Sequence, residues 1–258
     1  MKILVLTDLE GACGVCQFVQ TREDGPRYDE ARRLLMGDIN ACVDGLLEAG
    51  VDEIAVLDGH GKPYNFVPEM MHPRATHLVG SWPDRNSPFE RCDAVVLLAY
   101  HAMAETPDGV LCHSQSSRAG NRYWYNGRES GEITQHALIA GHFGAPVIMV
   151  TGDQATCREA REVLGDGPVT VAVKTGLGRE GAILLAPEAG RKLIRQGARD
   201  AVARLPQCTP YQIALPIKGR LSFPSKEVAD GYRPRRATRV DDLAFEATFD
   251  NPAEVIGF

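Results

Sequence analysis

The sequence lacks any uninterrupted apolar run of the roughly 20 residues that a membrane-spanning helix needs. The opening apolar run, residues 1–6, is short and is followed almost at once by Asp8 and Glu10, so we expect no signal peptide there. The chain also lacks a Lys/Arg stripe that could follow a phosphate backbone, since 28 basic residues face 34 acidic ones for a net charge of −6. We therefore expect a cytoplasmic protein with neither a membrane nor a nucleic acid as partner.

The cysteine pattern of a disulfide framework is missing as well. Seven cysteines, an odd number, are scattered over 258 residues, which favours reduced thiols. Cys13 and Cys16 form a Cys-x-x-Cys pair, but no second pair follows it. Structural or incidental thiols are therefore favoured over a redox or zinc-ligand role.

Apolar runs alternate with stretches of helical periodicity, a pattern typical of an α/β fold with a mostly parallel sheet flanked by helices. Strands are expected at residues 1–6, 54–57, 76–79, 94–99, 146–151 and 169–173, and helices at 28–47, 129–143, 154–164 and 187–205. Aromatic strand formers run into Asn126-Gly127, which predicts a β-hairpin over residues 122–128.

Beyond residue 206 the pattern changes to short strands without long helices between them. These strands are expected at residues 211–215, 223–228, 238–240 and 244–250. The sequence thus predicts two parts: an α/β metal-binding catalytic domain over residues 1–205, and a smaller β-rich C-terminal unit, of α+β or all-β type, over residues 206–258 packed on it.

Potential metal ligands follow three of the predicted strands. Asp8 and Glu10 follow the strand at residues 1–6, His60 follows that at 54–57, and His101 follows that at 94–99. Glu132 stands in the first turn of a predicted helix, where the helix dipole alone could favour a carboxylate. Each residue has an ordinary structural explanation when taken singly. Because the carboxyl ends of parallel strands converge on one crevice, their coincidence predicts a metal centre.

The residue types also indicate which metal the site would hold. Carboxylates combined with two imidazoles suit Zn²⁺, Mn²⁺ or Co²⁺ better than Ca²⁺ or Mg²⁺, which prefer oxygen ligands. The candidates exceed the four ligands of one tetrahedral zinc. A bridging carboxylate, for which Asp8 is best placed, would let them hold two ions roughly 3.5–4 Å apart, as in two-metal hydrolases.

His113 lies in a polar loop between the strand at residues 94–99 and the hairpin. Such a position suits a general base, a nucleophile or an oxyanion donor, although a loop histidine in contact with solvent would give the same pattern. The serines that follow it lack the Gly-x-Ser-x-Gly motif of a nucleophile elbow.

Taken together, these motifs resemble the M55 peptidases, whose type member is the zinc-dependent D-aminopeptidase of bacilli. The matching segments, in order, are Lys2–Gly11, Asp58–His60, Tyr100–Ala102, His113-Ser114 and Asn126–Glu132. The resemblance implies two zinc ions held by Asp8, Glu10, His60, His101 and Glu132, with a catalytic role for His113. It further implies release of N-terminal D-residues from short peptides, and a ring-like homo-oligomer, a decamer in the type member.

The loop over residues 115–121 is more polar than a pocket for small apolar D-residues would require. Arg118 and Asn121 of this loop are the candidate substrate-binding residues, and Arg118 could meet a substrate carboxylate. An amidohydrolase that acts on a non-peptide amide or lactam with the same metals is therefore an alternative. Two other classes also fit the sequence: a non-catalytic α/β protein that binds a small anion, and a two-metal phosphoryl hydrolase.

Overall fold

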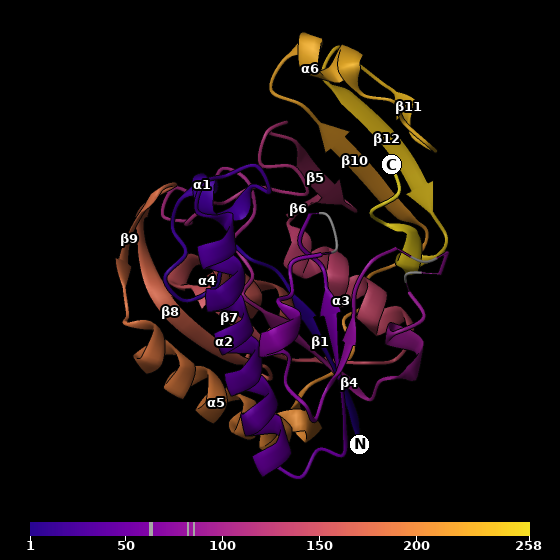
Figure 1. Cartoon of the computed structure of the whole chain (residues 1–258). Coiled ribbons are helices and arrows are strands. Elements are labelled where there is room, and N and C mark those ends of the chain that lie inside the picture. Colours follow the sequence, from indigo (N-terminus) through magenta and orange to yellow (C-terminus); the bar gives the residue numbers. More distant parts are fainter. Residues whose placement is uncertain (62–63, 82, 85) are drawn as a thin grey trace.

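The computed structural model describes residues 1–61, 64–81, 83–84 and 86–258, which form two β-sheets with helices around and between them (Figure 1). Sheet A has the order β3-β2-β1-β4-β7-β8-β9 and sheet B the order β11-β12-β10-β5-β6. The strands of sheet A are β1 (Lys2–Thr7), β2 (Glu53–Asp58), β3 (Thr76–Leu78), β4 (Ala94–Leu98), β7 (Val147–Asp153), β8 (Val169–Gly178) and β9 (Gly181–Leu184). Those of sheet B are β5 (Arg122–Tyr125), β6 (Arg128–Ser130), β10 (Ile217–Ser222), β11 (Thr238–Arg239) and β12 (Ala244–Phe249).

The four predicted helices are confirmed, with ends that differ by at most a few residues. The helices are α1 (Phe18–Thr21), α2 (Tyr28–Glu48), α3 (Glu132–His142), α4 (Gln154–Leu164), α5 (Pro187–Arg204) and α6 (Lys226–Gly231), with 3₁₀ turns η1 (Pro68–Met70), η2 (Phe89–Arg91), η3 (Leu205–Gln207) and η4 (Pro252–Glu254). In the described part of the chain, no helix combines the length and apolar character needed to cross a membrane.

Sheet A lies between two layers of helices. Alternate apolar side chains of its strands point to opposite faces, so both faces must be covered. Its strands from β3 through β8 run parallel, and β9 pairs antiparallel to β8 at the edge. Ile3 and Val5 of β1 pack in one apolar cluster with α2 and α5, whereas Leu4 and Leu6 pack in another with α3 and α4. The predicted α/β fold with a mostly parallel sheet flanked by helices is thereby confirmed.

Sheet B joins the predicted hairpin to the C-terminal strands. The hairpin β5–β6 turns at Asn126 and Gly127, which both have positive φ, the backbone that a tight hairpin turn demands. β5 then pairs antiparallel with β10. One face of the sheet buries an aromatic cluster against Leu138 of α3, so that α3 is shared between the two sheets. The division between residues 205 and 206 stays a prediction.

Two of the predicted C-terminal strands are wrong. Residues 211–215 form no strand, and the strand expected at 223–228 lies earlier, as β10 at Ile217–Ser222. Within β10, alternate residues from Ile217 to Leu221 are buried, the period of a half-buried strand. The hydroxyl of Ser225 accepts a hydrogen bond from the Val228 amide and begins α6. Phe223 therefore follows the end of β10, and Val228 lies in the capped helix α6.

Candidate metal centre

The candidate ligands lie where the winding direction of sheet A reverses. β1 and β4 are neighbours, with β2 and β3 on one side and β7 and β8 on the other, and ligand crevices form at the carboxyl ends of such strand pairs. The Gly11 amide donates to the Ala99 carbonyl at 2.7 Å, which ties the two strand ends together. A Cβ on residue 11 would lie 2.0 Å from the Tyr100 carbonyl oxygen, so only glycine permits this close approach.

Asp8, Glu10 and His60 form the first group of candidate ligands. His60 Nδ1 lies 2.9 Å from Asp8 Oδ1 and 3.0 Å from Glu10 Oε2. The other ring nitrogen, Nε2, lies 2.8 Å from the Thr21 carbonyl, which can only accept a hydrogen bond. That contact places a proton on Nε2 and turns Nδ1 toward the two carboxylates. Asp58, which ends the preceding strand, instead accepts hydrogen bonds from the backbone and side chain of Asn65.

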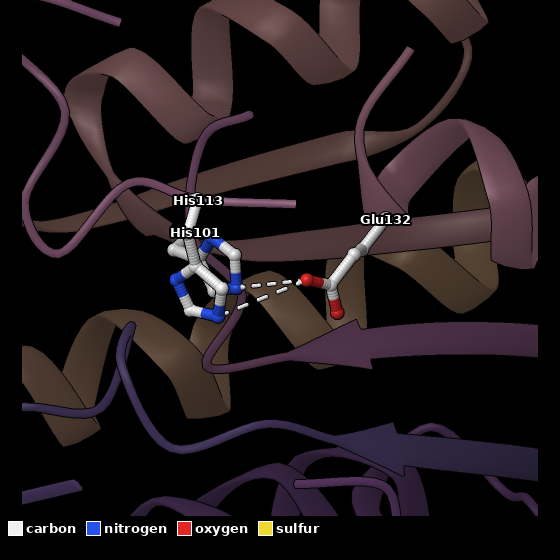
Figure 2. A group of neighbouring side chains, drawn as sticks. All are labelled: His101, His113 and Glu132. Carbon is white, nitrogen blue, oxygen red and sulfur yellow. Dashed lines mark ion pairs between the residues drawn. The ribbon is translucent and has the colours of Figure 1, made fainter. Parts of the chain in front are cut away.

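His101, His113 and Glu132 form the second group (Figure 2). Nε2 of His101 lies 3.4 Å from Glu132 Oε1, and Nε2 of His113 lies 3.9 Å from the same oxygen. The two imidazoles are stacked, with ring centroids 4.0 Å apart. In each ring Nδ1 faces a backbone carbonyl, that of Ala102 at 2.9 Å and that of Leu111 at 2.8 Å. Both Nε2 atoms are therefore turned toward the carboxylate.

Asp8 connects the two groups. Its Oδ1 faces His60, while its Oδ2 lies 3.3 Å from His101 Nε2. Glu10 Oε2 and His101 Nε2 are buried, yet neither makes a well-directed hydrogen bond within the described part of the chain. Ligand atoms around a tetrahedral zinc lie about 2.0–2.1 Å from the ion and hence roughly 3.3 Å from one another. The separations of 2.9 to 3.4 Å among these atoms fit that spacing.

The charged groups of the site shift one another's pKa values. Burial raises the pKa of Asp8, but its interactions with His101 and His60 outweigh burial and hold the pKa well below its usual range. Burial likewise raises the pKa of Glu132, and His101 brings it down to about 2. For His101, burial lowers the pKa, but Glu132 and Asp8 raise it well above its ordinary value. These carboxylates are thus ionised, as metal ligands must be.

His113 differs from the other two histidines. Burial and the nearby charge of His101 lower its pKa. It is 8% exposed and contributes to the wall of a cavity of about 720 Å³ that opens above the two ligand groups. A neutral imidazole with its Nε2 lone pair facing a cavity can accept a proton or attack a carbonyl carbon.

The two predicted substrate-binding residues lie in different surroundings. Arg118 and Asp24 both line the cavity, and the Arg118 guanidinium lies 3.5 Å from Asp24 Oδ1. Asn121 is 5% exposed, is not among the cavity's lining residues in the described structure, and donates to the Tyr123 hydroxyl at 3.0 Å. The substrate-binding role of both residues stays a prediction.

The structure adds a residue that the sequence analysis misses. Lys174, in β8, is fully buried, and its ammonium donates to the carbonyls of Glu10, Ala12 and Val15. It thereby holds the loop that carries Glu10. The only sequence signal is a lysine at the end of the apolar run 169–173.

Comparison with known proteins identifies the family. The model of the family Peptidase_M55, described as D-aminopeptidase, matches residues 1–258. The chain belongs to the M55 peptidase family. A D-aminopeptidase of Bacillus subtilis (strain 168) is 32% identical over 207 residues, which cover 77% of this chain and 73% of that protein. Membership confirms the predicted resemblance and the prediction of a hydrolase of the aminopeptidase class.

A solved D-aminopeptidase structure has the same fold. The structure titled "Zn-dependent D-aminopeptidase DppA from Bacillus subtilis, a self-compartmentalizing protease" superimposes with a TM-score of 0.89 at 24% sequence identity. The match covers 99% of this chain and 94% of the other. Both sheets of this M55 member therefore belong to one shared architecture.

The cysteine pair of this M55 member is not part of the two ligand groups found among the described residues. Cys13 is buried, and its amide donates to Asp38 Oδ2 at 2.7 Å. Cys13 and Cys16 are free thiols, and neither belongs to a metal-ligand group found among the described residues. Their predicted structural or incidental role stays a prediction.

Proposed function

We propose that this chain is a dinuclear zinc aminopeptidase that releases N-terminal D-residues from short peptides or amides. The observation that carries the proposal is Asp8, whose two carboxylate oxygens face different ligand groups, as those of a bridging ligand would. The D-aminopeptidase of Bacillus subtilis, at 32% identity, supports the substrate class, and the zinc-dependent structural relative supports the metal.

Under this proposal Asp8, Glu10 and His60 hold one zinc ion, and Asp8, His101 and Glu132 hold the other. When bound, the ions supply Lewis-acid polarisation of the scissile carbonyl. The same ligand set also suits Mn²⁺ or Co²⁺.

His113 is the proposed catalytic residue. The carbonyl of Leu111 holds its Nδ1 proton, so Nε2 presents a lone pair to the cavity. Because burial and His101 lower its pKa, the ring is neutral near pH 7 and ready to act as base or nucleophile. Arg118 and Asn121 stay the proposed substrate-binding residues.

The test is hydrolysis by the metal-reconstituted protein, assayed on D-alaninamide, L-alaninamide and a small cyclic amide. We expect two zinc equivalents by elemental analysis, preference for the D-amide, and loss of hydrolysis on chelation. Asp8→Asn should lose both metal and activity. His113→Gln should keep the metal and lose activity.

A matched control is Asp44→Asn. Asp44 Oδ1 lies 3.2 Å from His72 Nε2, an acid–histidine pair away from the cavity, so this variant should keep its zinc and its rate. A protein that binds no transition metal, or one that ignores chelation, would contradict the proposal. Faster cleavage of the cyclic amide would favour the alternative amidohydrolase.

We also propose that the chain forms a homo-oligomer, for which the resemblance implies a decameric ring. Support comes from the edge of sheet A, where Leu177, Ile183 and Leu184 are exposed on β8 and β9. Exposed apolar side chains beside an open strand edge are typical of subunit contacts. Light scattering after size exclusion should find a closed oligomer, and Ile183→Glu should dissociate it; a wild-type monomer would refute the assembly.

A further inference from the structure

Two arginines line the cavity, and their surroundings differ. Arg118 has a side chain that is 67% exposed, and it is paired with Asp24. Arg22 is half-buried, and its Nε is buried without a hydrogen-bond partner among the described residues. Arg22 is thus the less hydrated of the two cations and keeps an unused donor. Such a guanidinium is suited to bind a carboxylate that enters the cavity.

Phe18 links Arg22 to the proposed catalytic histidine. Arg22 Cζ lies 5.0 Å from the centroid of the Phe18 ring, and that centroid lies 6.4 Å from the centroid of the His113 ring. These two contacts limit the distance between guanidinium and imidazole to roughly three extended residues, at about 3.3–3.6 Å each. The contact of the carboxylate with Arg22 and the contact of the scissile bond with His113 take up part of that distance. One or two residues therefore fit between the scissile bond and the guanidinium.

The segment that carries Arg22 is held in place at several points. The Phe18 amide donates to Glu180 Oε1 at 2.9 Å, and Arg179 Cζ lies 4.9 Å from the same phenyl ring. The Arg22 amide donates to the Phe18 carbonyl at 3.1 Å, and the Arg22 carbonyl accepts from the Gly25 amide at 2.7 Å. The turn between β8 and β9 thus fixes this wall of the cavity, and Arg22 is positioned before a substrate arrives.

We infer that Arg22 binds the free C-terminal carboxylate of the substrate, so that the enzyme selects peptides of two or three residues over C-terminally amidated ones. The inference rests on the proposed function for the scissile bond, but the carboxylate contact itself requires no hydrolysis. A hydrogen-bonded ion pair of this kind contributes about 10- to 100-fold in affinity.

The test separates binding from turnover. Zinc-loaded His113→Gln protein is titrated by calorimetry with D-alanyl-glycine and with D-alanyl-glycinamide, with Arg22 intact or changed. We expect the free acid to bind about 10- to 100-fold more tightly than the amide, and Arg22→Gln to abolish this preference. Arg22→Lys should restore part of it. With His113 present, the same preference should appear in KM while kcat changes little.

Arg195→Gln is the control. It removes an arginine of α5 that pairs with Glu48 and is not among the cavity's lining residues in the described structure, so the acid-to-amide ratio should not change. An equal affinity for acid and amide, or a preference that Arg118→Gln removes and Arg22→Gln does not, would overturn the inference. If the acid preference holds in binding while the wild type hydrolyses neither compound, the inference stands and the proposed function fails.

Discussion

Glu159, in α4, is a buried acid behind the ligand groups, and replacing it with glutamine should stabilise the metal-free protein above pH 7. The residue is 4% exposed. Its Oε2 accepts a hydrogen bond from the Met103 amide at 2.7 Å, whereas its Oε1 is buried without a hydrogen-bond partner among the described residues. Burial raises the pKa of this carboxyl from 4.5 to about 7.

The sign of the effect follows from proton linkage. Between pH 4.5 and 7 the folded protein keeps a proton on Glu159 that the unfolded chain has released, so stability falls as pH rises. At about 1.36 kcal/mol per pKa unit, the loss reaches about 3 kcal/mol above pH 7. Glu159→Gln imitates the protonated acid and keeps an acceptor for Met103. The variant should therefore match the wild type near pH 4.5 and exceed it by about 3 kcal/mol at pH 8.

The assay is thermal unfolding in the presence of a chelator, from pH 4.5 to 8.5. For a chain of this size, about 3 kcal/mol corresponds to a melting temperature roughly 6–12 °C higher. Glu162→Gln, an exposed change on the same helix, should leave the curve unchanged at every pH. A difference between Glu159→Gln and the wild type that does not vary with pH would refute the reasoning.

Three further changes test other parts of the structure. Gly11→Ala should lower the free energy of unfolding, measured in urea, by about 3 kcal/mol or more, because its Cβ would meet backbone atoms. The control Gly231→Ala, with open space around the residue, should be neutral. Equal urea midpoints for the two variants would contradict this. Lys174→Met leaves three buried carbonyls without a hydrogen-bond donor, and each should cost about 1–3 kcal/mol of stability. The variant should also bind zinc more weakly, as measured by competition with a chromophoric chelator. Unchanged zinc affinity would show that the loop keeps its shape without the ammonium. Burial raises the pKa of the Cys13 thiol, so iodoacetamide at pH 8 should modify Cys13 only after denaturation, as peptide mass spectrometry would detect.

Most elements of the fold could be predicted from local patterns. The crossover helix α2 shows the 3.6-residue period, the buried strands are continuous apolar runs, and Asn126-Gly127 specifies its own turn. The predicted strand at residues 223–228 is wrong because Ser225 caps a short helix there, a local choice that apolar content hides. The edge strand β9 has no clear signal in the sequence, because its short apolar run is partly exposed and does not alternate.

By itself, the sequence determined which residues stand at the ends of strands and helices, and hence the chemical types available to the site, because those positions depend on local periodicity. The tertiary structure alone decided that β1 lies beside β4, that Asp8 faces His60 and His101 with different oxygens, and that Lys174 reaches the Glu10 loop. Those contacts join residues 52 to 164 positions apart in the chain. Strand order and side-chain direction set such contacts, and neither leaves a mark in the local pattern of residues.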